Sequence, residues 1–490
     1  MRETTLPPSA PALLESLRAV GYSFEAAVSD VVDNSLSAHA SRISIQFRTQ
    51  PDVYLAILDN GVGMSALTLE EAMRHGGLGP AGEREPADLG RFGLGLKTAS
   101  LSQCRQLTVV SMHANALAGA EWSLDRVEAT GDWTLGLLDP SDIEEVPHLN
   151  WLREAGAGTI VLWRDFDRAL AGATNREGEF GDLVAKAREH LSLVFHRFLQ
   201  PEAPRYPTIE IDINGNSVRP TDPMLIDRSV RLPDHRVRVE DAFIDFTPYV
   251  LPHRSRMTRA ELVQVDGVDG LRRSQGFYVY RARRLITSGT WFRLRAQDEM
   301  TKLARVRVDI PNKLDHLWQV DIKKSTATPP QQVREGVRQV LNSIGQTSKE
   351  VIRHRGWKGR ASGGRLWQRL ENPNGVTYVV NRDHPALTAL TAGVAERERV
   401  DLERLLKALE MTIPFQEIYV DVAAEREVSP SFPSDEVEEE LRELLGRLLM
   451  ASAQAGGKEA KSRTEQAVRS MEPFNRYPEL TKRLLTEVEG

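Results

Sequence analysis

Three short segments near the start of the chain combine residue types that suit phosphate and metal chemistry. In the first, residues 24–35, the side chains of Asp30 and Asn34 are four residues apart, so they share a face if the segment is helical. A carboxylate in that position can hold a water molecule, and an amide oxygen can bind Mg²⁺, which prefers hard oxygen ligands. Asp30 and Asn34 are therefore candidates for these two tasks.

The second and third segments suit a base and a phosphate chain. Residues 58–64 place Asp59 at the end of an apolar strand and follow it with Gly61 and Gly63. A carboxylate there can accept the amino proton of an adenine, and glycine lets the backbone approach a flat base closely. Residues 90–100 form a glycine-rich turn that opens a helix. Its backbone N–H groups and the positive helix end make a phosphate cradle, to which Lys97 adds charge.

Each segment alone also has an ordinary explanation. An Asp/Asn pair on a helix is usually a solvated face, an Asp-Asn-Gly sequence is usually a turn, and a lone glycine-rich turn binds phosphate in only about one case in five. The order and spacing of all three segments together favour a nucleotide site.

The elements around these segments indicate an α+β fold. Apolar residues recur every three or four positions over residues 11–40, which predicts a helix. Strands are expected at residues 43–47, 53–58, 106–112 and 159–163, and a helix from 183 to 198 is expected to lead out of the first domain. A helix followed by antiparallel strands predicts a helix-on-sheet layer and not a Rossmann unit.

The remaining residues divide into further domains. Strands at residues 209–214, 277–280 and 306–310 indicate a second α+β domain, and residues 353–365 have the composition of a basic linker. Beyond it we expect a strand at 376–380, helices near 386–410 and an acidic helix after Ser434. We therefore predict domains at 1–180, 181–350 and 371–490, with the linker at 351–370; the role of the last domain is open.

Composition describes a folded protein of about three domains. The 490 residues are 41% hydrophobic and 27% charged, as in soluble globular proteins. No apolar run is long enough for a membrane span, the first residues lack the apolar stretch of a signal peptide, and one cysteine, Cys104, excludes an internal disulfide. We expect a cytoplasmic protein without a membrane partner. The net charge of −6 gives the whole chain no attraction for nucleic acid.

With its three segments in this order, the sequence resembles the GHKL superfamily. That superfamily includes gyrase B subunits, MutL, the ninety-kilodalton heat-shock chaperones, histidine kinases and MORC proteins, and the resemblance is nearest to MORC and its bacterial relatives. It implies a Bergerat-type ATP-binding sandwich, with helices on a mixed, mainly antiparallel sheet. In that pattern the general base falls on Asp30, the Mg²⁺ ligand on Asn34 and the adenine ligand on Asp59.

The same resemblance assigns the rest of the pocket. Gly61, Gly63 and Met64 lie beside the base, and Thr159, within residues 156–163, supports adenine through water. Residues 65–89 correspond to a lid rich in Gly and Pro. The phosphate-covering motif falls on Gly90, Arg91, Phe92, Gly93, Leu94, Gly95 and Lys97. The sequence departs from the family at one position, because the usual catalytic glutamate is Asp30 here, which is one methylene shorter. The resemblance implies an ATPase, and slow hydrolysis follows from the shorter reach.

The resemblance extends into the second domain. Residues 276–286 and 318–325 are similar to the transducer domain, of the type found in ribosomal protein S5, that follows the pocket in MORC- and MutL-type proteins. There a loop lysine reaches the γ-phosphate, which makes Lys323 or Lys324 the candidate. Such a cation stabilises charge on a transferred phosphoryl group. Two solvated lysines are the alternative, since the motif is loose.

The expected partners follow in part from the relatives. An ATP-dependent homodimer is implied by analogy. A basic stretch with interleaved aromatic residues can hold double-stranded DNA, through Arg254, Arg256, Arg272, Arg273, Arg281, Arg283 and Arg284. A charged outer face over a buried strand is the alternative.

We therefore expect a Mg-ATP-dependent switch or clamp acting on DNA, as in bacterial genome defence or repair. A chaperone-like ATPase for protein clients is the alternative. A histidine kinase is disfavoured, because no helical His-Glu phosphoacceptor pair precedes the pocket.

Overall fold

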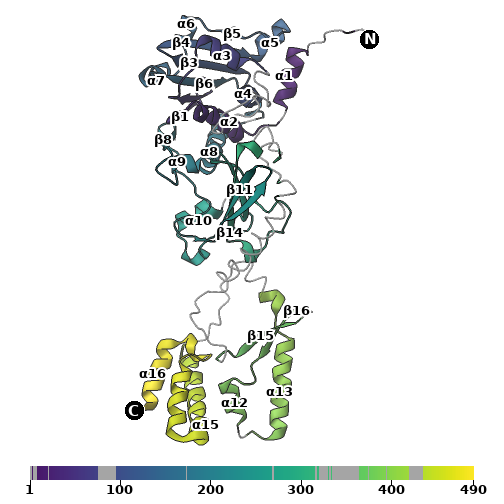
Figure 1. Cartoon of the computed structure of the whole chain (residues 1–490), viewed down its shortest axis with the longest axis vertical. Coiled ribbons are helices and arrows are strands. Elements are labelled where there is room, and N and C mark those ends of the chain that lie inside the picture. The colour runs from purple at the N-terminus through teal and green to yellow at the C-terminus, as the bar shows by residue number, and fades with distance from the viewer. Residues whose placement is uncertain are drawn as a thin grey trace. The chain divides into compact units, whose positions relative to one another are not determined.

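The computed structural model describes residues 8–19, 21–75, 95–172, 174–266, 270–314, 364–372, 375–392, 394–418 and 434–489, with Glu3, Leu317, Trp318, Pro329 and Val333. It divides into two compact units, Met1–Arg355 and Gly356–Gly490. The first unit contains two sheets, and the second contains a hairpin and helices (Figure 1).

The larger sheet has eight strands in the order β5-β4-β3-β6-β2-β1-β7-β8. Every neighbouring pair is antiparallel except β1 and β7, which are parallel. The strands are β1 Arg42–Arg48, β2 Tyr54–Asp59, β3 Gln106–His113, β4 Ala116–Ser123, β5 Gly136–Leu137, β6 Gly158–Arg164, β7 Glu210–Ile213 and β8 Asn216–Ser217. The mixed, mainly antiparallel sheet expected from the sequence is confirmed.

Alternating side chains of this sheet enter two separate cores. Leu55, Ile57, Val161 and Trp163 belong to the larger core, together with apolar residues from the main helices. These helices are α1 Ala10–Arg18, α2 Phe24–Ser37, α4 Gly95–Gln103 and α8 Arg176–Val194. The neighbouring strand positions belong to a smaller core with α6 Pro140–Glu144 and α7 Leu149–Ala155. Helices therefore cover both faces, and α3 Ala66–Met73 and α5 Leu124–Thr130 pack on β4.

The segment expected to be one helix over residues 11–40 is two helices. Gly21 lies between them with φ +79°, a left-handed conformation that favours glycine and interrupts a helix. The extended Ser23 then precedes α2. The apolar spacing continues across this break, because Val20 and Phe24 lie four positions apart on either side of Gly21.

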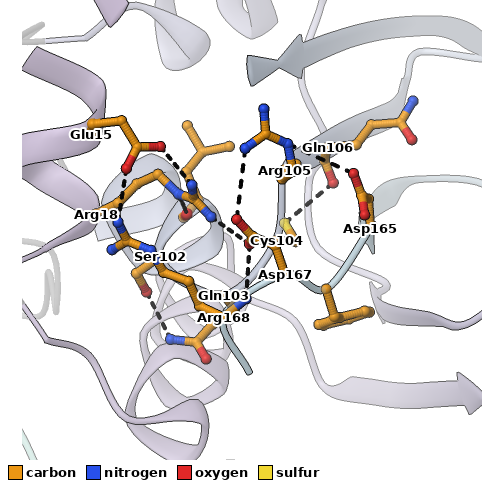
Figure 2. A network of polar contacts seen from close by, with 12 residues as sticks. Glu15, Arg18, Ser102, Gln103, Cys104, Arg105, Gln106, Asp165, Asp167 and Arg168 are labelled. Atoms are coloured by element: carbon orange, nitrogen blue, oxygen red, sulfur yellow. Dashed lines mark hydrogen bonds and ion pairs between the residues drawn. The ribbon is translucent and has the colours of Figure 1, made fainter. Parts of the chain in front are cut away.

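A polar network fastens α1 to the sheet (Figure 2). Arg18 is 3% exposed, and its guanidinium bonds Glu15 at 2.7 Å, Asp167 at 2.5 Å and the Leu101 carbonyl oxygen at 2.6 Å. Arg168 bonds the second carboxylate oxygen of Glu15 at 2.8 Å. The end of α1 is thereby attached both to α4 and to the segment that follows β6.

The second sheet has six strands. Five follow the order β10-β11-β14-β12-β13, and β9 pairs with β11. They are β9 Val230–Arg231, β10 His235–Val239, β11 Ala242–Val250, β12 Gly276–Arg281, β13 Arg284–Thr290 and β14 Ala304–Ile310, with α10 Arg259–Asp266 and the short helices Arg254–Arg256, Glu299–Thr301 and Asn312–Leu314. Phe246, Phe277 and Trp291 lie in its core.

The strand expected at residues 209–214 belongs to the first sheet and not to the second. After α8 and α9 His196–Leu199 the chain returns, and β7 pairs in parallel with β1. Asn214 then binds the backbone N–H of Phe47 through its side-chain oxygen at 2.8 Å. Strand periodicity identifies such a segment but carries no information on which sheet it joins.

The second unit is mixed, as expected. It contains the hairpin β15 Trp367–Asn372 and β16 Gly375–Val380, with helices α12 Pro385–Thr391, α13 Glu396–Met411, α15 Ser434–Val468 and α16 Pro478–Glu489 and the short helix Phe474–Arg476. Leu441, Leu445, Phe474 and Leu484 form part of its core. Among the described helices of the whole chain, none is both long and apolar enough to cross a membrane.

Candidate nucleotide-binding site

Three polar side chains lie in one row across the middle of the first sheet. Asp59 on β2 pairs with Thr159 on β6, and Thr159 pairs with Ser111 on β3. Directly opposed residues of antiparallel strands share a face, and here it is the face of α2 and α4. The Ser111 and Thr159 hydroxyls are 3.0 Å apart, and Ser111 also accepts the backbone N–H of Met64 at 2.8 Å.

The carboxylate of Asp59 is buried, and each of its oxygens accepts a hydrogen bond. Asp59 is 4% exposed; its Oδ2 accepts from the Ser35 hydroxyl at 2.9 Å and its Oδ1 from the Gly61 N–H at 2.9 Å. Burial raises the pKa of the carboxyl, while the Gly61, Ser35 and Thr159 donors act in the opposite direction. The result is a buried acceptor at the end of a strand.

The loop after Asp59 has room only for glycine at two positions, because neighbouring backbone atoms lie very close to them. Gly63 has φ +67°, and a Cβ there would lie 1.9 Å from the carbonyl oxygen of Met112. A Cβ at Gly61 would lie 2.7 Å from the Ala38 carbonyl oxygen. This carbonyl also accepts the Val62 N–H at 3.0 Å. The loop is therefore closely packed between the end of α2 and β3.

On α2, Asp30 and Asn34 differ in exposure. Asp30 is 2% exposed; the Tyr22 hydroxyl donates to its Oδ2 at 2.9 Å, and the Arg284 guanidinium lies 3.8 Å from its Oδ1. Asn34 is exposed, so its side-chain oxygen is accessible to a metal. No group of three or more His, Cys, Asp or Glu suited to a metal occurs in the described part of the chain. A single amide oxygen fits Mg²⁺, which completes its shell with water and phosphate oxygens.

The start of α4 lies beside Asp30. A Cβ built at Gly95 would be 3.9 Å from the Oδ2 of Asp30. Lys97 is buried, its ammonium donates to the Ala72 carbonyl at 2.7 Å, and burial lowers the pKa of this lysine to about 8 despite the attraction of Glu71. The structure thus places Lys97 against the end of α3. Gly90, Arg91, Phe92, Gly93 and Leu94 of the same motif lie outside the described residues, as do Lys323 and Lys324.

The basic stretch expected to hold DNA requires a correction. Arg281 and Arg284 are 6% and 3% exposed, and Arg283 lies over the rings of Phe198 and Tyr206 at 4.8 and 4.1 Å. Arg281 and Arg284 cannot present their guanidinium groups to a phosphate backbone in this structure, and Arg283 is half-buried, with its Nη2 donating to the Arg197 carbonyl oxygen. The interleaved Phe277, Tyr278, Tyr280 and Trp291 are buried as well. They belong to the sheet core because β12 is covered on both sides.

The other four arginines expected to contact DNA are exposed: Arg254, Arg256, Arg272 and Arg273.

Sequence reasoning missed four contributions to the site. Ser111 and Ser35 bond to Thr159 and Asp59, while Tyr22 donates to Asp30 and Arg284 forms an ion pair with it. A polar residue at Ser111, within the otherwise apolar end of β3, was a signal for the first. The Arg284 contact joins residues more than 250 positions apart, and no local pattern indicates it.

Comparison with known proteins supports the nucleotide domain. Residues 22–159 match the family described as "Histidine kinase-, DNA gyrase B-, and HSP90-like ATPase", and this span contains Asp30, Asn34, Asp59 and Thr159. No curated protein matches the chain.

One similar solved structure is the "Crystal Structure of N terminal domain of a DNA repair protein". It is 16% identical with a TM-score of 0.40, and the match covers 70% of this chain and 98% of that one. The GHKL type of the N-terminal domain, the α+β fold and an ATP-dependent activity are supported by the family match. A nearest relationship to MORC proteins stays a prediction.

Proposed function

We propose that the protein is a Mg-ATP-dependent switch that binds ATP at Asp59, hydrolyses it slowly, dimerises in the ATP-bound state and acts on DNA. The observation that carries the proposal is the buried row of Asp59, Thr159 and Ser111 at the end of β2, within the span that matches the ATPase family. A buried carboxylate with spare acceptor capacity suits the amino group of adenine.

The residues divide the work as follows. Asp59 accepts a hydrogen bond from the adenine amino group, and Thr159 and Ser111 support the base side of the pocket. Asn34 contributes one oxygen to Mg²⁺, and the metal, when bound, neutralises phosphate charge. Asp30 orients the attacking water and accepts its proton. The short side chain of Asp30 limits its reach, which accounts for slow turnover in the proposal.

The DNA component of the proposal relies on four exposed arginines, Arg254, Arg256, Arg272 and Arg273. They lie in the connections between β11, α10 and β12, and they supply positive charge that can contact a phosphate backbone. A protein client is the second candidate, because three of the seven arginines expected to face DNA are buried or stacked within the protein.

The test is Mg²⁺-dependent ATP hydrolysis by the purified chain, with and without double-stranded DNA. Asp59→Asn is compared with Asp52→Asn, the same change at a side chain that is 83% exposed. An amide has one acceptor oxygen where Asp59 uses two, so we expect at least about tenfold weaker ATP binding, or roughly 1.4 kcal/mol. Asp52→Asn should match the wild type.

The outcomes separate the parts of the proposal. Stimulation by DNA that disappears in Asp59→Asn supports a DNA-directed switch. Turnover that is indifferent to DNA favours a protein client. Failure of the wild-type protein to bind ATP overturns the proposed function.

A further inference from the structure

Arg284 connects the second sheet to the helix that carries Asp30. It is the first residue of β13, yet its guanidinium is 3% exposed and lies against α2. Its Nε donates to Asp33 Oδ1 at 2.7 Å, its Nη1 to the Leu285 carbonyl at 3.0 Å and its Nη2 to the Ser29 hydroxyl at 3.4 Å. All three nitrogens of the fork are thus engaged at the junction.

The same guanidinium also approaches Asp30, at 3.8 Å from Nη2 to Oδ1. Two buried carboxylates, Asp30 and Asp33, follow one another by three positions on α2 and are 2% and 1% exposed. A buried carboxylate is costly unless it is paired and hydrogen-bonded. Arg284 brings a positive charge to both, and that charge comes from the second sheet.

The carboxylate of Asp30 is therefore contacted from two sides, by one hydrogen bond and by one ion pair whose 3.8 Å separation is longer than a hydrogen bond. The Tyr22 hydroxyl donates to Oδ2 at 2.9 Å, and Arg284 faces Oδ1. Tyr22 lies immediately before α2, within the nucleotide domain, whereas Arg284 moves with β13. A displacement of β13 relative to α2 would thus change the orientation of the Asp30 carboxylate without altering Asp59 or the adenine side of the site.

We propose that Arg284 is a positioning residue that couples the second sheet to ATP hydrolysis, by holding the carboxylate of Asp30 in the orientation needed to activate water. The inference rests on the proposed ATPase function and deepens it. It distinguishes two tasks within one junction: Asp33 anchors the guanidinium through Nε, and Nη2, which also donates to the Ser29 hydroxyl, places its charge beside Asp30.

A purely structural role for Arg284 makes different predictions, and Arg197 provides the matched comparison. Arg197 is a second buried arginine that joins the two sheets, since it extends from α9 to Asp309 on β14 at 2.5 Å. None of its described contacts is with α2. Loss of Arg197 therefore loosens the same junction without touching Asp30.

The experiment measures, on the full chain, the Kd for ATP and the single-turnover rate of hydrolysis for the wild type, Arg284→Gln, Arg284→Lys and Arg197→Gln. We expect hydrolysis by Arg284→Gln to fall about 10- to 100-fold, since a misplaced catalytic group costs rates of this order, while Kd changes less than about threefold. Arg284→Lys should recover part of the rate, and Arg197→Gln should retain most of it.

A charge-balanced variant keeps the test valid if Arg284→Gln folds poorly. In Arg284→Gln/Asp33→Asn the anchoring carboxylate is removed together with the cation, so the burial cost of an Asp33 that has lost Arg284 is relieved. Hydrolysis should stay low because Asp30 still lacks Arg284. Recovery to the wild-type rate in the double variant would show that Arg284 only neutralises Asp33, and would overturn the inference.

Two further outcomes also overturn the inference. One is an unchanged hydrolysis rate in Arg284→Gln. The other is that Arg197→Gln loses as much hydrolysis rate and as much ATP affinity as Arg284→Gln does. The wild-type titration separates these from a failure of the proposed function. If the wild type binds and hydrolyses ATP while the variants behave as just described, the coupling role alone is wrong. If the wild type binds no ATP, the ATPase proposal fails, and the coupling role fails with it.

Discussion

Two carboxylates of the nucleotide site are buried, and their surroundings differ in a way that suits two different tasks. Asp59 is held by neutral donors, the Ser35 hydroxyl and the Gly61 N–H. Asp30 is held by a phenol and by a guanidinium. Neutral donors suit a residue that accepts one more hydrogen bond from a neutral base, whereas a cation stabilises a carboxylate that must remain charged in a buried place.

His75 predicts a dependence of stability on pH. Its ring lies between Trp122 and Trp133, 5.1 Å from each ring centroid, and neither ring nitrogen has a hydrogen-bond partner among the described residues. Burial, with the nearby charge of Lys97, lowers its pKa from 6.5 to about 4. The unfolded chain therefore takes up a proton at this residue at a higher pH than the folded chain does.

The contribution of neutral His75 to the free energy of unfolding is therefore present above pH 6.5 and is lost as the pH falls towards 4. Between pH 7 and 5 the free energy of unfolding should decrease by about 2 kcal/mol through this residue. Urea unfolding at both pH values measures it. His75→Phe keeps an aromatic ring and should show a smaller decrease; an equal decrease in the variant would contradict the assignment. His190, whose pKa is also lowered to about 4, titrates in both proteins.

At this scale, sequence reasoning was most informative where the chemistry is local. Asp30 and Asn34 share a helix and Asp59 ends a strand, so the order and spacing of the motifs, together with the family resemblance, selected them as candidates. Ser111 lies next to Thr159 through strand register, and Arg284 reaches Asp30 through the packing of two sheets. Both contacts depend on distant parts of the chain, which periodicity cannot describe.

Among the elements, α1 depends on polar contacts for its attachment. Leu14 and Ala10 are its buried apolar side chains, and the helix has nine residues, so little apolar area holds it. The buried Arg18 contributes bonds to Asp167, Glu15 and Leu101. Short helices are marginal without tertiary contacts, so the guanidinium should determine how firmly α1 is attached.

We predict that Arg18→Gln destabilises the attachment of α1 by roughly 1–3 kcal/mol, because it removes the guanidinium that donates to the Leu101 carbonyl and to Asp167. Hydrogen exchange of the α1 amides should accelerate by about tenfold or more. Arg168→Gln is the control, since that side chain is 37% exposed and its ion pair contributes little. Equal exchange of α1 in wild type and Arg18→Gln would refute the prediction.

The elements themselves were largely predictable. Most strands of the first sheet that carry the site follow from alternation or from short apolar runs, and the α+β layer is confirmed. The break at Gly21 was not recognised, because one glycine within a continuing apolar pattern resembles a tolerated helix residue. The membership of β7 was also wrong, since strand pairing is a long-range property.

For the whole molecule, the proposed switch predicts a nucleotide-dependent change of oligomeric state. Asp30→Ala should remove the proton acceptor while leaving Asp59 and Asn34 in place, so bound ATP persists. We expect this variant to be a dimer at saturating Mg-ATP by analytical ultracentrifugation. Asp59→Asn, which binds ATP poorly in the proposal, should stay monomeric under the same conditions. An Asp30→Ala protein that remains monomeric would count against the switch.

The parallel pairing of β7 with β1 has a practical consequence for dividing the protein into fragments. A fragment that ends at residue 180, the boundary expected from the sequence, would lack β7 and leave the edge of β1 that it covers, over Arg42 to Ile45, without its pairing strand. Such an open edge promotes association between sheets. A soluble nucleotide-binding fragment should therefore extend through Val218, whose backbone N–H still bonds Ile211.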